Sequence, residues 1–302
     1  MRAGLKISAF AAALAATFGT AYGVGQGIDP LVTESAPEPH ASHEEAAAEG
    51  AAASPAGGLQ VSEGGYALDL RTPSVTAGQR SDLRFVIRDS AGRAVTAYER
   101  ENTKELHLII ASRDLGTYRH VHPARGADGT WSIPVELPRA GGYRVLADFT
   151  PAKKGAENLT LGADLAVAGA YEPRRLPEAT RTVDVDGYQV RLTGGLTPGT
   201  GSELELTVAR DGRPVTDLQP YLGSYGHLVA LRSGDLAYLH VHPHGRPEPG
   251  PDVSFEATAP SSGTYRLFLD FKHDGQVRTA AFTVTAGAVT PGADTDEAAH
   301  GH

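Results

Sequence analysis

The sequence predicts an all-β protein in which two tandem immunoglobulin-like antiparallel β-sandwich domains follow an N-terminal hydrophobic helix. Short runs of alternating polar and apolar residues are separated by turns rich in glycine and proline, of which the 302-residue chain has 36 and 20. One such pattern occurs twice along the chain, and a mostly apolar stretch precedes both copies. Together these features indicate two small sandwiches made of short strands.

The first 28 residues are predicted to form a signal sequence or a membrane anchor. Arg2 and Lys6 precede an uncharged, mostly apolar stretch at residues 7–28, which is the pattern of an export signal. At about 1.5 Å per residue this stretch can span a bilayer, which favours an anchor. The small residues Ala21 and Gly23 also permit cleavage. We therefore expect an extracytoplasmic protein, held by this segment or secreted after its removal.

The rest of the chain divides by composition and by the repeat. Residues 29–58 are rich in Ala, Glu and Pro and predict a flexible linker, and residues 287–302 predict a disordered tail. The predicted segments are a signal or anchor at 1–28, a linker at 29–58, the first sandwich at 59–170, a linker at 171–181, the second sandwich at 182–286 and the tail at 287–302.

The two copies share histidines at the same spacing. In each copy one histidine lies thirteen residues before a His-x-His-Pro motif, and a strand beginning with Gly and Tyr and ending in Asp-Phe follows. Tyr143 and Tyr265 in these later strands resemble the tyrosine corner of immunoglobulin-like domains. The repeated histidines are His107, His120 and His122 in the first copy and His227, His240 and His242 in the second.

Each set of three histidines is predicted to share one face of a hairpin. Side chains alternate between faces along a strand, so His120 and His122 point the same way. A turn near Asp114 and Leu115 places His107 opposite His122 on that face, with Leu108 on the other face, toward the core. The second copy predicts the same arrangement.

A cluster of three histidines in each domain predicts a transition-metal site. With no cysteine and no methionine besides Met1, the ligands must be imidazoles and carboxylates, and we expect Cu2+ or Zn2+. Asp148 and Asp270 recur as candidates for a fourth ligand or for a partner that orients an imidazole. In an alternative interpretation the histidines are structural and pack against Tyr118 and Tyr238.

The repeated motifs also resemble a known group of proteins. The stretch from His107-Leu108 through Arg113-Asp114-Leu115 to His120-Val121-His122-Pro123 resembles exported bacterial sandwich proteins of the YtkA-like and CopC-like group. The resemblance covers both repeats, and it implies a sandwich fold and the handling of copper or other heavy metals in the cell envelope. The chain departs from the CopC pattern because it lacks methionine-rich ligands.

The function expected from these features is non-catalytic binding of a transition metal by an exported envelope protein. Its partners would be the metal ion and an envelope metal transporter, with membrane contact through the N-terminal segment only. The net charge of −9 argues against nucleic acid. Two alternatives stay open, namely a metal-independent interaction module displayed on the envelope and a zinc hydrolase that uses a three-histidine site.

Overall fold

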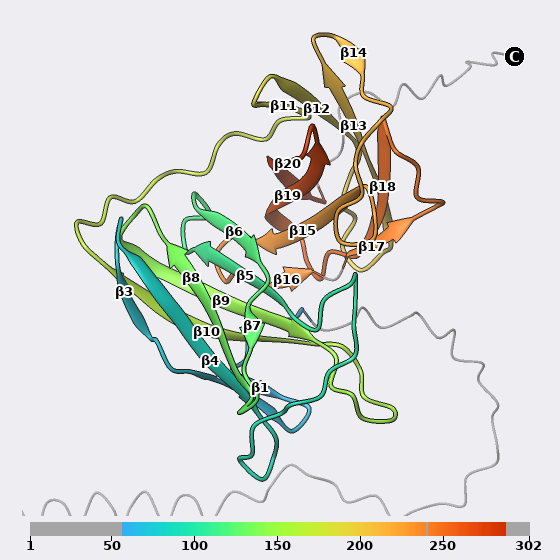
Figure 1. The fold of residues 1–302 in the computed structure, drawn as a ribbon. Helices are drawn as coiled ribbons and strands as arrows, with labels where there is room; N and C mark the ends of the chain where they lie inside the picture. The colour runs from blue at the N-terminus through green and yellow to red at the C-terminus, as the bar shows by residue number, and fades with distance from the viewer. Residues whose placement is uncertain (1–55, 240, 288–302) are drawn as a thin grey trace, which may run out of the picture. The chain divides into compact units, whose positions relative to one another are not determined.

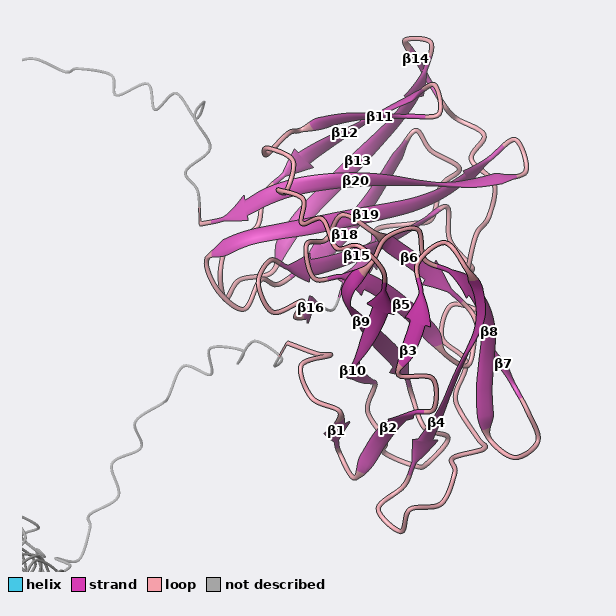
Figure 2. Cartoon of the chain, turned by 90° about the vertical axis from the view of Figure 1, so that its left-hand side faces the viewer, coloured by secondary structure: helices cyan, strands magenta, loops and turns pink. Residues whose placement is uncertain are grey.

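The structure, a computed structural model, describes residues 56–239 and 241–287, and these residues confirm the all-β prediction. Strands and loops account for all of them, and no helix in these two ranges is long and apolar enough to cross a membrane. The strands build two sandwiches, which belong to one compact unit at residues 51–302 (Figures 1 and 2). The expectations for residues 1–28, for most of the 29–58 linker and for residues 288–302 lie outside the described residues.

The first sandwich consists of two five-stranded sheets. One sheet has the order β1 (Ser62–Glu63), β2 (Tyr66–Leu70), β4 (Arg80–Arg88), β8 (Thr130–Glu136) and β7 (Ala124–Arg125). The other has the order β3 (Ser74–Thr76), β10 (Leu159–Ala168), β9 (Gly141–Phe149), β5 (His107–Ser112) and β6 (Tyr118–Val121). All of these pairings are antiparallel except that of β3 with β10, which is parallel.

The second sandwich repeats this plan with small changes. Its first sheet contains β11 (Thr182–Val185), β12 (Tyr188–Gly194), β13 (Ser202–Arg210), β18 (Asp252–Ala257) and β17 (Val241–His244), with β14 (Arg213–Pro214) paired to β13. Its second sheet has the order β16 (Tyr238–Leu239), β15 (Gly226–Arg232), β19 (Gly263–His273) and β20 (Gln276–Ala286). The tandem repeat predicted from the sequence is thus confirmed.

Two details confirm the predicted immunoglobulin-like character. The hydroxyl of Tyr143 donates a hydrogen bond to the carbonyl of Arg139 at 2.9 Å, and that of Tyr265 donates to the carbonyl of Ser261 at 2.8 Å. Both bonds reach back four residues, as a tyrosine corner does. The predicted hairpin register is also correct in the first copy, where β5 and β6 pair Leu108 with Val121.

Each sandwich has its own core, made by the inward-facing half of alternating strands. In β13, for example, Leu204, Leu206 and Val208 are fully buried whereas the residues between them are partly exposed. The strands that carry the histidines behave differently, because all six residues of β5 are buried. Leu108 faces the core of the first sandwich, and Ile109 belongs to a separate cluster. A second layer therefore covers the outer face of this sheet.

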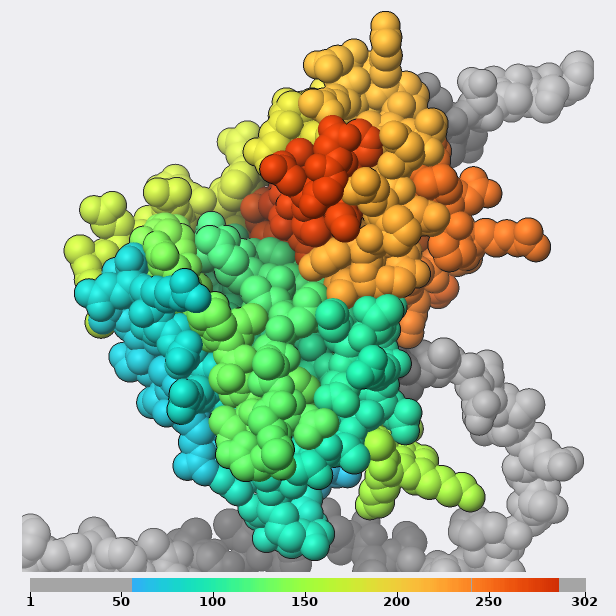
Figure 3. Space-filling model, in the orientation of Figure 1, coloured from blue at the N-terminus to red at the C-terminus, as the bar shows by residue number. Residues whose placement is uncertain are grey.

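That second layer is the equivalent sheet of the other sandwich. A third apolar cluster contains residues of β5, β6 and β9 together with residues of β15, β16 and β19. Figure 3 shows the two sandwiches in contact on one face of the molecule. Tyr118 stacks on Phe268 with ring centroids 3.9 Å apart and planes within 3°. The members of the cluster are equivalent pairs in the repeat, namely Ile109 and Val229, Ala111 and Leu231, Leu115 and Leu236, Tyr118 and Tyr238, and Leu146 and Phe268.

The chain just before the first strand joins this interface. Gly57 exchanges two backbone hydrogen bonds with Tyr238, of 3.0 and 2.9 Å, so it extends the sheet of the second sandwich. Gly58, with φ of +75°, donates to the carbonyl of Thr160, and a side chain on Gly58 would meet Leu146 at 2.4 Å. The backbone conformation and the close contact with Leu146 leave room only for glycine at this position.

The third cluster is expected to contribute strongly to stability. Phe268→Ala removes the ring that stacks on Tyr118 and leaves a cavity between the sandwiches, so unfolding should cost about 4 kcal/mol less. The measurement is chemical denaturation of the chain and of the control Val277→Ala, whose side chain is 45% exposed and whose loss should change stability by about 0.5 kcal/mol or less. Equal effects of the two substitutions would contradict the proposed packing.

Candidate metal centre

Four histidines from both sandwiches gather at one end of the interface cluster. His107 begins β5, His120 lies on β6, His122 follows β6, and His227 lies on β15. The pleat turns His107 and His120 to the same face as Ile109, which is the face covered by the second sandwich. His107 is 3% exposed, and the side chain of His120 is 1% exposed. The group is therefore shielded from water by the packing of two domains.

Nitrogen atoms of these rings lie close to one another. One nitrogen from each of His107, His120 and His227 lies within 4.8 Å of the others. His107 Nδ1 is 3.1 Å from His120 Nε2 and 3.3 Å from His122 Nε2. Two ligands of a tetrahedral zinc ion, each at about 2.0 Å from it, are about 3.3 Å apart. The spacing of these atoms is therefore the spacing that a shared ion requires.

Neighbouring groups fix where the ring protons lie. His107 Nε2 is 3.1 Å from the carbonyl oxygen of Glu101, which can only accept, so this nitrogen carries the proton. His120 Nδ1 is 2.9 Å from a carboxylate oxygen of Asp270 and donates to it. The remaining nitrogens, His107 Nδ1 and His120 Nε2, are then both acceptors and lie 3.1 Å apart. A metal cation between them, or a hydrogen bond to His107 Nδ1 from His122 Nε2 at 3.3 Å, would satisfy such a contact.

Burial disfavours protonation of His120 and His227. It lowers the pKa of His120 and of His227 to about 3, and the neighbouring imidazoles lower both further. The pKa of His122 also falls to about 3, chiefly through burial and then through His120, His107 and the charge of Lys104. These rings are therefore neutral at pH 7, as metal ligands must be. A divalent cation satisfies the facing lone pairs without protonating any of them.

A second layer of contacts holds the ligands in place. The other oxygen of Asp270 accepts a 2.6 Å hydrogen bond from Thr279, and burial raises the pKa of Asp270 to about 6. At pH 7 the His120–Asp270 contact is therefore a hydrogen bond from a neutral imidazole to a carboxylate. The carboxylate of Glu101 accepts hydrogen bonds from Thr150 and Asn158, and this anchoring keeps its carbonyl directed at His107.

The arrangement differs from the two separate clusters that the sequence predicted. Four of the described histidines form one group, which combines His107, His120 and His122 with His227 and Asp270 of the second sandwich. Asp148, the repeat equivalent of Asp270, is buried and accepts a hydrogen bond from Thr160 at 3.0 Å. His240 lies outside the described residues.

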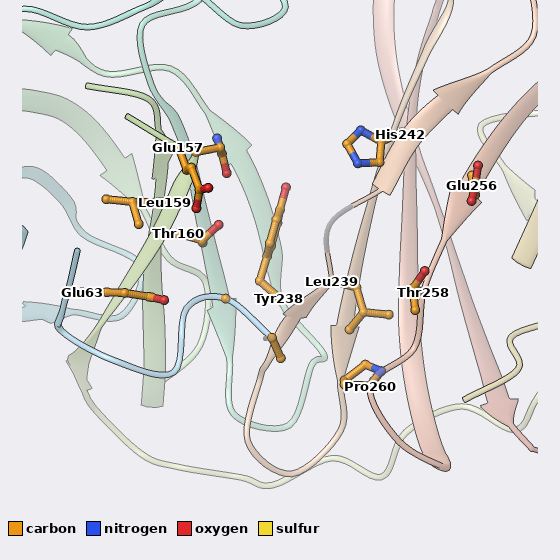
Figure 4. A pocket seen from close by; sticks show the side chains of 13 residues that line it. Glu63, Glu157, Leu159, Thr160, Tyr238, Leu239, His242, Glu256, Thr258 and Pro260 are labelled. Carbon is orange, nitrogen blue, oxygen red and sulfur yellow. The ribbon is translucent and has the colours of Figure 1, made fainter. Parts of the chain in front are cut away.

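His242 is placed elsewhere because the second copy changes sheets earlier. Strand β6 stays with β5 through Val121, whereas β16 ends at Leu239 and β17 pairs with β18 instead. His242 thus lies opposite Glu256 and is exposed. It lines a groove of about 440 Å³ between the sandwiches, across from Glu157 (Figure 4). The predicted cluster of His227, His240 and His242 within the second domain stays a prediction, because His240 lies outside the described residues.

The sequence contained a signal for the shared site. The runs after His107 and after His227 are continuously apolar, and a strand with no polar alternation is buried on both faces. Both predicted packing partners, Tyr118 and Tyr238, belong to the interface cluster, and the ring that Tyr118 stacks on is that of Phe268. The face that carries the histidines is thus also the face through which the two sandwiches pack against each other.

The fold and the site together define a tandem immunoglobulin-like protein whose histidines meet between its domains. A family described as a domain of unknown function (DUF8832) matches residues 60–161 and 182–288. Because these two matches cover more than half of the chain, the protein belongs to that family, with one copy of the domain in each sandwich. No curated protein matches the chain.

Several solved structures show low similarity to the chain. The Escherichia coli adhesin FdeC is 17% identical, with 75% of this chain and 65% of that chain covered and a TM-score of 0.24. A marsupial T cell receptor is 14% identical, with coverages of 74% and 99% and a TM-score of 0.22. Invasin, a bacterial integrin-binding protein, is 11% identical, with coverages of 73% and 39% and a TM-score of 0.23. The chain thus spans less than two thirds of the adhesin and of invasin.

The buried imidazoles should make the metal-free protein sensitive to acid. The lowered pKa values of His120, His122 and His227 mean that the unfolded chain binds more protons between pH 6.5 and about 3, so their stabilising contribution is complete above pH 6.5 and is lost as the pH falls. The raised pKa of Asp270 acts in the opposite sense between about pH 4 and 6. Near pH 5 unfolding should therefore take up about two protons.

This prediction is checked by denaturant unfolding of chelator-treated protein from pH 5 to pH 8. His227→Gln should reduce the proton uptake by about one, since one of the three depressed imidazoles is removed. The matched control is His244→Gln, which removes an exposed histidine on β17. A stability that does not vary with pH in this window would show that the imidazoles are not buried as described.

Proposed function

We propose that the chain is an exported envelope protein that binds one transition-metal ion, Cu2+ or Zn2+, between its two sandwiches and does not catalyse a reaction. One observation carries the proposal. His107 and His120 direct lone pairs at each other across 3.1 Å in a buried site, while their other nitrogens are held by Glu101 and Asp270. A buried pair of acceptors is costly unless a cation joins them.

The donor set supports the choice of ions. The ligands available are imidazole nitrogens, with the carboxylate of Asp270 behind one of them. Imidazole suits Cu2+ and Zn2+, and the absence of cysteine and of internal methionine removes the sulfur ligands that favour Cu(I). The resemblance to the YtkA-like and CopC-like group supports copper as one of the two candidates.

Location and partners are part of the proposal. The apolar stretch at residues 7–28 supports export, with membrane contact through that segment only. An envelope transporter that delivers or receives the ion is the expected protein partner. A hydrolytic role is less well supported, because Glu105, a carboxylate near His122, is already bound by Arg125 at 3.1 Å and is not free to act as a general base.

Metal analysis and thermal melting of the full chain test the proposal. We expect one equivalent of Cu2+ or Zn2+ per chain, and an ion present at 100 times its Kd should stabilise the protein by about 2.7 kcal/mol. His120→Ala and His227→Ala should each abolish the shift, although these residues belong to different sandwiches. His242→Ala and the control His244→Ala should retain it, because both side chains are exposed on β17.

Other outcomes would distinguish the alternatives. Two equivalents of metal, one of them lost with His242→Ala, would restore the picture of a separate site in each domain. A chain that takes up no ion and whose melting midpoint does not respond to metals or chelator would refute the proposal. The histidine group would then serve only to hold the two sandwiches together, as in a displayed interaction module.

A further inference from the structure

A small cavity opens beside the histidine group, on the side of His122. It has a volume of about 270 Å³, at the lower end of the size range of ligand pockets. His122 is half-buried and lines this cavity, and its Nε2 lies 3.3 Å from Nδ1 of His107. Of the four histidines in the group, only His122 lines this cavity. Its other lining residues include Arg100, Lys104, Glu105, Arg125 and Trp131.

The cavity carries an excess of positive charge. Arg125 binds the carboxylate of Glu105 at 3.1 and 3.2 Å, and its guanidinium lies 5.6 Å from the ring centre of Trp131. The charges of Arg125 and Glu105 therefore cancel. The charges of Arg100 and Lys104 have no compensating carboxylate among the lining residues. The chain as a whole has a net charge of −9, so the cavity is a local exception. Clefts with one sign of charge concentrate ions of the opposite sign.

A tight turn at residues 101–104 brings one of these charges, that of Lys104, to the cavity beside His122. Glu101 and Lys104 exchange two backbone hydrogen bonds of 2.9 Å, and the residues between them, Asn102 and Thr103, both have positive φ, of 46° and 71°. The same turn directs the carbonyl of Glu101 to His107 and brings Lys104 to the cavity wall. The ligand geometry and the positive charge thus depend on one piece of backbone.

We infer that this cavity binds a small anion, a carboxylate or an inorganic oxyanion, which reaches the metal ion as an additional ligand beside His122. The inference rests on the proposed metal site. An ion held by neutral imidazoles retains its positive charge, and the anion would be attracted by the ion together with Arg100 and Lys104. The groove lined by His242 differs in sign, because its charged residues are Glu63, Glu157 and Glu256.

Copper loading followed by titration with azide tests the inference on the full chain. Azide bound to Cu2+ gives a charge-transfer absorption band, so the band reports an anion on the ion itself. We expect a saturable band in the parent protein and an apparent Kd for azide raised about fivefold or more at low salt in the double variant Arg100→Gln/Lys104→Gln. The difference should shrink at high salt, since these charges are exposed.

The control is the double variant Lys153→Gln/Lys154→Gln, which removes two exposed charges from the β9–β10 loop of the same sandwich and should leave the Kd for azide unchanged. Competition by acetate and by inorganic phosphate then shows whether the cavity prefers a carboxylate or an oxyanion. Full copper uptake with no azide band, or with the same Kd in all variants, would overturn the inference while leaving the metal site intact. Absence of copper uptake would overturn both.

Discussion

The packing of two equivalent sheets against each other determines most of what is distinctive about this chain. The outer face of β5, β6 and β9 in the first sandwich is apolar, and so is the matching face of β15, β16 and β19. Each face buries the other, so the histidines at the end of the interface lose their water at the same time. Without this contact His107 and His120 would lie at the surface of the first sandwich.

Burial and orientation act together in the histidine group. Burial lowers the pKa of His120, His122 and His227, and a hydrogen-bond acceptor behind His107 and another behind His120 decide which nitrogen faces inward. One of these acceptors, Asp270, comes from the opposite sandwich, so the orientation of a first-repeat histidine depends on the second repeat. The two domains are therefore both needed for one group of histidines, although each has a complete core of its own.

Much of this could be predicted from the sequence, for local reasons. The alternation of residues gave the strands and their faces, the spacing of His107 from His122 gave the correct hairpin register, and Tyr143 and Tyr265 marked the immunoglobulin-like corner. The docking of the sandwiches could not be derived from local spacing, because it joins residues more than a hundred positions apart. His242 lies apart from the histidine group because β16 ends at Leu239 and the chain then pairs with β18 in the other sheet. The near-identical motifs of the two copies do not reveal this difference.

The pairing of Gly57 with Tyr238 gives the interface a mechanical role. The chain ahead of residue 56 leads to the apolar segment at residues 7–28, and its first described contact is with the edge strand of the second sandwich. A force applied to the chain just before Gly57 would thus reach both sandwiches at once, through β16 on one side and through the bond from Gly58 to Thr160 on the other. The interface between the sandwiches would therefore carry part of such a force.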